Sequence, residues 1–259
     1  MADTVRLEID GGYAELVLDR PDKVNAIDDA MVADLHASFD RIEESGVRAL
    51  VVRGEGRGFC AGRDLAGADP ANEDGEAILN DSLNPVVARL AGLAVPTFAA
   101  VHGAALGTGL GLALACDVVY VADDARIGSP FARIGAVLDS GAHDFLTRRI
   151  GAHRALELVY TGRLLSGREA AEWGIVNRSV GRTDLLPRVR QMARAVAVGP
   201  TLAFVASKRI VRRIADEGLG LADVLRAEAA AQGAASATHD YQDGIAAFQE
   251  KRTPRFTGT

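Results

Sequence analysis

The stretch TFAAVHGAALGTGLGLALACDVVYVA (97–122) contains one charged residue, Asp117, in twenty-six positions. Its first part, TFAAVHG (97–103), is an apolar run typical of a buried strand. GLGLALAC (109–116) follows a glycine turn and predicts a buried helix, and DVVYVA (117–122) predicts a second strand. Strands that alternate with helices indicate an α/β fold, in which helices cover a sheet.

The charge-free segment extends from Leu90 to Cys116, which is long enough to span a bilayer. Pro96, His102 and five glycines interrupt it, so we expect a buried strand, a turn and a helix. No membrane association is therefore expected.

The chain before this segment has the same α/β character. TVRLEIDGGYAELVLDRP (4–21) alternates apolar and polar residues on both sides of a Gly-Gly pair, which predicts a hairpin. Asp28 is the expected N-cap of a helix that ends at Gly46, and RALVVRG (48–54) is the expected next strand. A polar, glycine-rich loop (55–76) and an amphipathic segment to about residue 93 complete this part.

The chain after about residue 142 is expected to be almost wholly helical. WGIVNRSV (173–180) is the one later strand candidate, and the Ala-rich tail from Gln191 to Phe256 is expected to be helical throughout. The composition of this tail suits packing, so we expect it to dock on the core or on another subunit.

Composition excludes several classes of function. The 259 residues carry a net charge of −6 with a pI of about 5.4, so no nucleic-acid partner is expected. Two cysteines form no disulfide framework, and no Cys/His cluster has the spacing of metal ligands. The first residues lack the pattern of a signal peptide, and a cytoplasmic location is expected.

Two loops could direct backbone N–H groups at one ligand. In GFCAGRDL (58–65) and HGAALGTGLGLALACD (102–117), small residues follow a buried strand, where backbone can approach a ligand closely. A helix N-terminus of this kind stabilises a phosphate or an oxyanion on a carbonyl. The spacing fits neither a dinucleotide fingerprint nor a phosphate loop, and the alternative is that the glycines serve packing alone.

Five segments together resemble the enoyl-CoA hydratase/isomerase (crotonase) superfamily in the family's order and over nearly the whole chain. The resemblance implies a spiral of ββα units over 1–195, a C-terminal helical trimerisation region over 196–259, and homotrimers or homohexamers. It also implies acyl-CoA thioester substrates, with no cofactor apart from the coenzyme A of the substrate. The segments are RPDKVNAI (20–27), GFCAGRDL (58–65), AAVHGAALGTGLGLALACDVVYVADDARIGSPFARIG (99–135), TGRLLSGREAAEWGIVNRSV (161–180) and FQEKRTPRF (248–256).

The resemblance also assigns residues to roles. It implies that the N–H groups of Arg63 and Thr108 form an oxyanion hole; threonine stands where relatives usually have glycine, and a β-branched residue resists positive φ. The residues implied to contact coenzyme A, the last two across a subunit interface, are Lys23, Val24, Ala61, Asp64, Leu65, Phe248 and Lys251.

The acids of the chain favour one reaction over another. Hydratases of the family use two glutamates, and Gly111 and Phe131 stand at those positions here. Asp139 occupies the position of the single acid of family isomerases. We expect Phe131, Val137 and Leu138 to line an apolar acyl pocket that raises the pKa of Asp139. The alternative for Asp139 is a helix N-cap, and His143 either tunes it or is a structural histidine.

These observations leave several hypotheses. The first is a Δ3,Δ2-enoyl-CoA isomerase, or a ring-epoxide phenylacetyl-CoA isomerase, that moves a proton with Asp139. The second is a hydratase or another enolate chemistry, such as thioester hydrolysis. The third is an acyl-CoA-binding protein without catalysis.

Overall fold

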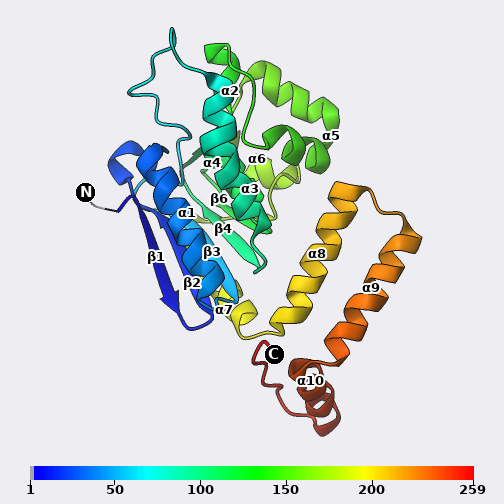
Figure 1. The fold of residues 1–259 in the computed structure, drawn as a ribbon. Coiled ribbons are helices and arrows are strands. Elements are labelled where there is room, and N and C mark those ends of the chain that lie inside the picture. The colour runs from blue at the N-terminus through cyan, green and yellow to red at the C-terminus, as the bar shows by residue number, and fades with distance from the viewer. Residues whose placement is uncertain (1–2) are drawn as a thin grey trace.

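A computed structural model describes residues 3–259 (Figure 1). Its main sheet has six strands in the order β1-β2-β3-β4-β6-β9, antiparallel between β1 and β2 and parallel elsewhere. A smaller sheet has the order β5-β7-β8. The strands of the main sheet are β1 (Val5–Asp10), β2 (Tyr13–Leu18), β3 (Ala49–Gly54), β4 (Thr97–Val101), β6 (Val118–Ala122) and β9 (Arg178–Val180). Those of the smaller sheet are β5 (Ala104–Leu106), β7 (Arg126–Gly128) and β8 (Leu165–Ser166).

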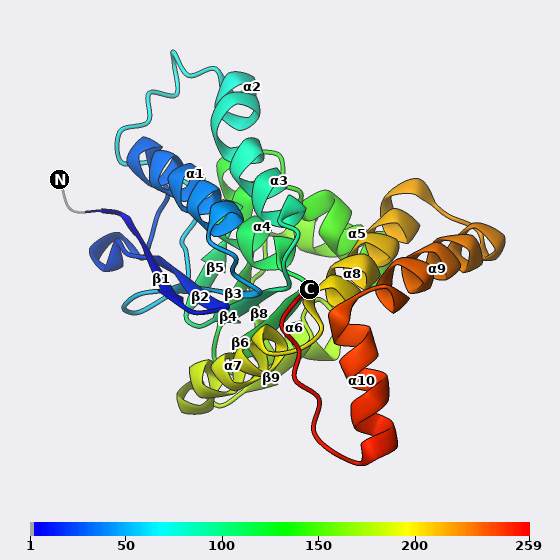
Figure 2. The same ribbon diagram turned by 60° about the horizontal axis from the view of Figure 1, so that its bottom comes forward.

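Helices cover both faces of the main sheet (Figure 2). α7 packs on one face against β2, β3, β4 and β6, whereas α1, α3 and α4 lie on the other. The helices of the core are η1 (Pro21–Lys23), α1 (Asp29–Glu44), α2 (Gly75–Ile78), a π-helical turn η2 (Leu79–Leu83), α3 (Asn84–Gly92), α4 (Thr108–Ala115), η3 (Pro130–Ile134), α5 (Ala142–Thr161), α6 (Gly167–Glu172) and α7 (Arg182–Ala197).

The last three helices extend away from the sheet (Figures 1 and 2). They are α8 (Thr201–Glu217), α9 (Leu221–Ser236) and α10 (His239–Glu250). The expected boundary between 195 and 196 falls in the last turn of α7. Residues 251–259 contain no helix, so the prediction of a tail that is helical to Phe256 is wrong at its end.

Most elements lie where the sequence pattern places them. The hairpin, the strand at 49–54 and the helix that begins after Asp28 are confirmed, and the Asp28 carboxylate accepts a hydrogen bond of 2.9 Å from Met31 N. The charge-free segment forms β4, β5 and the wholly buried helix α4. Within residues 3–259, no helix has the length and apolar character needed to cross a membrane.

The strands of the small sheet are the elements that sequence analysis missed. They have two or three residues each, which is too short for alternation to be visible. Within 173–180 only Arg178–Val180 forms a strand, because a turn occupies the residues before it.

A buried acid joins α7 to the sheet. Glu15 on β2 is 3% exposed and accepts hydrogen bonds from Arg53 (2.8 Å) on β3 and Arg190 (2.6 and 2.8 Å) on α7. Burial opposes its ionisation, but hydrogen bonds from Arg190, Tyr13 and Arg53 outweigh that effect and lower its pKa to about 2. The ionised carboxylate is therefore the form that stabilises the fold.

We predict that Glu15→Gln lowers the free energy of unfolding by about 3 kcal/mol at pH 7, because it removes the buried charge that pairs with Arg53 and Arg190. Because the pKa of Glu15 is lower in the folded chain than in the unfolded chain, this stabilisation is present above about pH 4.5 and is lost as the pH falls toward 2. Urea unfolding of both proteins from pH 7 to pH 3 should therefore show a shrinking difference. The exposed Glu8→Gln is the control, with an expected change below about 0.5 kcal/mol. An equally small effect of Glu15→Gln would contradict the prediction.

Candidate active site

The N-terminus of α4 is the centre of the candidate site. Gly107 precedes the helix with a positive φ of +53°, and Thr108, the first helical residue, does not share that conformation. The expected conflict between a β-branched residue and positive φ is therefore absent, because the glycine before it makes the turn.

The second loop reaches α4 through a close backbone approach. Cys60 N donates to Ala104 O (2.9 Å) and Leu106 N donates to Cys60 O (3.0 Å), which joins the loop to β5. A Cβ atom on Gly109 would lie 2.7 Å from the Cβ of Cys60, and one on Gly62 would lie 3.6 Å from Thr108 N. The peptide before Arg63 thus lies beside the first turn of α4.

The amides of Arg63 and Thr108 share one property. Across residues 3–259, neither N–H has a protein hydrogen-bond acceptor. The residues on either side of Arg63 form the backbone hydrogen bonds with Ile27: Gly62 O accepts from Ile27 N (2.8 Å), and Asp64 N donates to Ile27 O (2.8 Å). The side chain of Arg63 forms an ion pair with Glu73 in the loop before α2. In residues 3–259, therefore, no acceptor of the protein itself occupies either amide.

Asp139 lies beside this helix end. α5 begins at Ala142 with Gly141 as its N-cap and no side-chain cap bond, so the interpretation of Asp139 as a helix cap is wrong. Its Oδ1 lies 2.8 Å from Ser140 Oγ, which lies 3.0 Å from Thr108 Oγ1. Burial raises the pKa of Asp139, against the opposing effects of the Ser140 hydrogen bond and of His143 and Arg63. A partly buried carboxyl with a raised pKa is a candidate for a general base.

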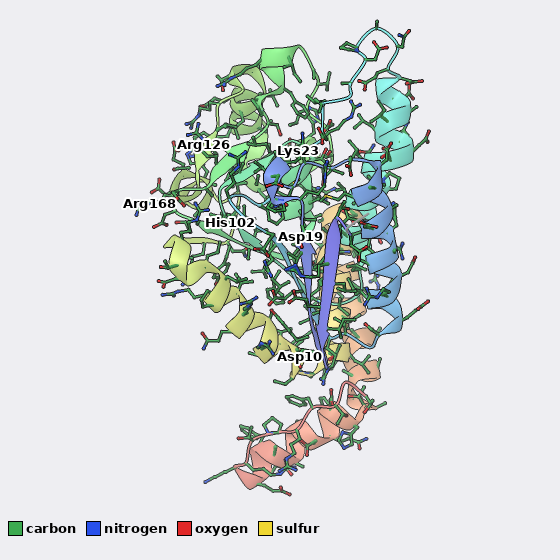
Figure 3. The ribbon with its side chains drawn as sticks, turned by 90° about the vertical axis from the view of Figure 1, so that its left-hand side faces the viewer. Asp10, Asp19, Lys23, His102, Arg126 and Arg168 are labelled. Carbon is green, nitrogen blue, oxygen red and sulfur yellow. The ribbon has the colours of Figure 1, made fainter. Side chains whose placement is uncertain are left out.

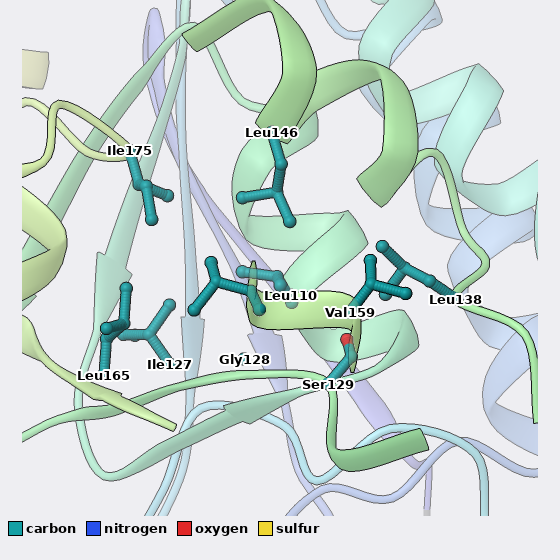
Figure 4. Close-up of a pocket in the computed structure, with 10 residues that line it drawn as sticks. Leu110, Ile127, Gly128, Ser129, Leu138, Leu146, Val159, Leu165 and Ile175 are labelled. Atoms are coloured by element: carbon teal, nitrogen blue, oxygen red, sulfur yellow. The ribbon is translucent and has the colours of Figure 1, made fainter. Parts of the chain in front are cut away.

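The residues expected to line the acyl pocket separate in the structure. The half-buried Phe131 has its ring against Gly107, where an added Cβ would lie 3.0 Å from Cζ. Val137 is 78% exposed, whereas Leu138 is buried and lines a small, mostly apolar cavity with Leu110 and Val159 (Figure 4). In the single chain, therefore, the three residues do not line one common cavity, and the ring of Phe131 packs against the glycine turn that precedes Thr108.

Five of the residues expected to contact coenzyme A belong to two segments that hydrogen bonds hold together. Ala61 N donates to Val24 O (2.9 Å), and Asp64 accepts from Arg20 (3.1 Å). A hydrogen bond from Ala66 N, followed by the effect of Arg20, lowers the pKa of Asp64. The side chains of Lys23 and Leu65 are exposed beside these contacts.

The other two residues lie far from this cluster. Phe248 is 84% exposed on α10, and Lys251 follows that helix as its C-cap. Lys23 lies at the end of the molecule opposite α10 (Figure 3). Phe248 and Lys251 therefore do not join the site of their own chain.

Sequence analysis gave no role to Asn25, which connects the first segment to the core. It is fully buried, its Nδ2 lies 2.9 Å from both Glu55 O and Gly58 O, and its Oδ1 accepts from Arg20 N (2.8 Å). Val24 and Asn25 have φ values of +52° and +54°, an unfavourable conformation for a valine that these bonds maintain. In the sequence, the one sign of this role is a single polar side chain between the apolar residues Val24 and Ala26.

Comparison with known proteins identifies the class. The family model for enoyl-CoA hydratase/isomerase matches residues 8–259. The chain is 36% identical to "Probable enoyl-CoA hydratase" of Rhodobacter capsulatus, over 98% of each chain. It is 34% identical to the "1,2-epoxyphenylacetyl-CoA isomerase" of Escherichia coli, over 100% of each. A crystal structure of enoyl-CoA hydratase from Bacillus anthracis superposes with a TM-score of 0.91 and 29% identity, over 99% of this chain and 100% of that one.

The chain therefore belongs to the enoyl-CoA hydratase/isomerase family, whose members act on acyl-CoA thioesters. The predicted family and the α/β crotonase fold are confirmed.

We predict that Asn25→Ala lowers the free energy of unfolding by about 2–3 kcal/mol, because it leaves buried carbonyls without a donor. It should also increase hydrogen exchange at the amide of Ala61, whose acceptor is Val24 O. Asn72→Ala, at an exposed asparagine in the loop before α2, is the matched control, with an expected change below about 0.5 kcal/mol. Equal effects of the two changes would show that Asn25 does not hold the segment.

Proposed function

We propose that the chain is an acyl-CoA isomerase that moves a proton with Asp139 beside an oxyanion hole formed by the amides of Arg63 and Thr108. The observation that carries this proposal is a half-buried carboxyl, with a raised pKa, two hydrogen bonds away from the first residue of α4. The proposed contact residues for coenzyme A are Lys23, Val24, Ala61, Asp64 and Leu65. Phe248 and Lys251 act in this proposal on a neighbouring subunit of a trimer or hexamer.

The proposed reaction is a double-bond migration. The Asp139 carboxylate removes a proton from C2 of a 3-enoyl-CoA, and the electrons pass to the thioester oxygen as a dienolate. The amides of Arg63 and Thr108 stabilise that charge, each by roughly 3 kcal/mol. Asp139 then returns the proton to C4, which restores the thioester and the carboxylate. Burial of Asp139 supports this role, because a raised pKa makes a stronger base.

Close packing argues against a hydratase. A Cβ on Gly111, at the first glutamate position of hydratases, would lie 2.8 Å from the Cβ of Ser140, so a glutamate has no room there. Phe131, at the second position, places an aromatic ring beside Gly107 instead of a carboxylate. In this proposal, therefore, neither of the two glutamates that activate water in hydratases is present.

The second candidate is the isomerisation of a ring epoxide of phenylacetyl-CoA. The relative in Escherichia coli carries the name of that activity, which is the observation in its favour. The same base and amides serve this candidate, and the shape of the acyl group decides between the two.

The test uses 3-hexenoyl-CoA, 2-hexenoyl-CoA and 1,2-epoxyphenylacetyl-CoA in D₂O. We expect bond migration with deuterium at C2 or C4, and a loss in kcat of about 10²- to 10⁴-fold in Asp139→Asn. The kcat should also fall at acid pH as Asp139 becomes protonated. The midpoint of this fall should lie above 3.8, the ordinary pKa of an aspartate, because burial raises the pKa of Asp139. Rapid formation of 3-hydroxyhexanoyl-CoA would favour a hydratase, and no exchange with any of the three substrates would favour a binding protein.

We predict that Gly111→Ala lowers the free energy of unfolding by about 2 kcal/mol and abolishes most isomerase activity, because the new methyl group displaces Ser140. Gly233→Ala in α9 is the matched control, since a Cβ there meets no atom within 4 Å. That control should be neutral or stabilise the chain by up to about 1 kcal/mol. Urea unfolding and kcat measure both variants, and a harmless Gly111→Ala would contradict the packing argument.

A further inference from the structure

Two buried hydroxyl groups connect the oxyanion residue to the proposed base. Ser140 is 2% exposed and Thr108 is 1% exposed. Ser140 Oγ lies 2.8 Å from Asp139 Oδ1 and 3.0 Å from Thr108 Oγ1, so it bridges the two side chains. Local sequence patterns do not reveal the contact between Ser140 and Thr108, because these residues are thirty-two positions apart.

The direction of these hydrogen bonds follows from the chemistry of the groups. An ionised carboxylate only accepts, so Ser140 uses its single hydroxyl hydrogen for Asp139. Ser140 Oγ then accepts the hydroxyl hydrogen of Thr108. The chain of donors therefore runs from Thr108 through Ser140 to Asp139.

The arrangement is held at a conformational cost. Ser140 has a φ of +54°, a region that favours glycine, and its backbone packs against Gly111 of α4. A glycine at position 140 would fit that φ without strain but would have no hydroxyl. Strained residues that persist at a site indicate a functional constraint.

We infer that Thr108 and Ser140 are positioning residues that hold Asp139 Oδ1 in place and leave Oδ2 free to exchange the proton of the substrate. In the part of the chain that the structure describes, Oδ2 accepts no hydrogen bond. Thr108 thus has two roles, an amide for the thioester oxygen and a hydroxyl that orients the base. This inference rests on the proposed function of Asp139.

The pH dependence of the base provides a specific readout. The groups that face Asp139 are Ser140, His143 on α5 and Arg63 in the loop after β3. The Ser140 hydroxyl stabilises the carboxylate, so its loss should raise the pKa of Asp139 and move the acid limb of kcat to higher pH. His143→Gln, measured alone and combined with the Ser140 variant, separates the effect of His143 on the acid limb from that of the Ser140 hydroxyl.

The kinetic test uses 3-hexenoyl-CoA with Ser140→Gly, Thr108→Val and Thr108→Ser. We expect Ser140→Gly to lower kcat about tenfold with KM within about twofold, and to shift the acid limb upward. Thr108→Val keeps the amide and the shape of the side chain but lacks the hydroxyl, and its kcat should be several-fold below that of Thr108→Ser. Circular dichroism and thermal midpoints establish that each variant is folded.

A double variant tests the connection itself. Because Thr108 acts on the base through Ser140, Thr108→Val combined with Ser140→Gly should be no slower than Ser140→Gly alone. Independent, multiplying losses would overturn the inference, as would an unchanged kcat and acid limb in Ser140→Gly.

A measurement without turnover separates this inference from the proposed function. Carbon-13 NMR of labelled aspartate carboxyls, with Asp139→Asn to assign the resonance, gives the pKa of Asp139 in the wild type and in Ser140→Gly. A higher pKa in Ser140→Gly supports the positioning role even if no substrate is turned over, and equal values overturn it. A wild type that is inactive on all three substrates, or an Asp139→Asn variant that keeps its activity, would instead overturn the proposed function.

Discussion

The close approach of two loops to α4 is the constraint on which the site depends. Gly109 and Gly111 have no Cβ, and the space is filled by Cys60 from one loop and Ser140 from the other. Backbone that packs against backbone in this way has little freedom to shift, because protein interiors are close-packed. The amide of Arg63 and the carboxyl of Asp139 are therefore both positioned relative to one short helix, whose own first amide belongs to Thr108.

The same packing limits the chemistry that this family scaffold can perform. A residue at position 111 must be small because Ser140 occupies its surroundings, and Phe131 covers Gly107. Asp139, which Ser140 connects to the side chain of Thr108, is an acid in a partly desolvated position. Desolvation raises the pKa of a carboxyl and so makes its carboxylate a stronger base. It also disfavours two ionised carboxylates side by side, because each buried charge needs a compensating partner. In the proposed function, this single acid and the two amides are the groups that transfer the proton next to a thioester.

The sequence was sufficient for the elements with clear periodicity. The β1–β2 hairpin, α1 with its Asp28 cap and the buried helix α4 follow from local patterns. The catalytic role of Asp139 stays a prediction from family motifs. Contacts between segments that are distant in the sequence could not be predicted from local patterns. No pattern around Asn25 reveals its three carbonyl partners, and no pattern around Ser140 reveals Thr108. Leu138 and Val137 are adjacent in sequence, yet the backbone directs one into the core and the other to the surface.

The C-terminal helices pose a different constraint. α8 and α9 bury no residue within one chain, and Leu202, Val211, Leu221 and Leu225 are exposed on them. Contiguous apolar surface in water is unfavourable, and its usual compensation is contact with another molecule. The position of α10 adds a geometric argument, because Phe248 and Lys251 lie at the end of the chain opposite Lys23. If these two residues contact coenzyme A, that ligand is bound by a neighbouring copy of the chain. The same association between copies would then cover the apolar side chains of α8 and α9 and complete the coenzyme A site.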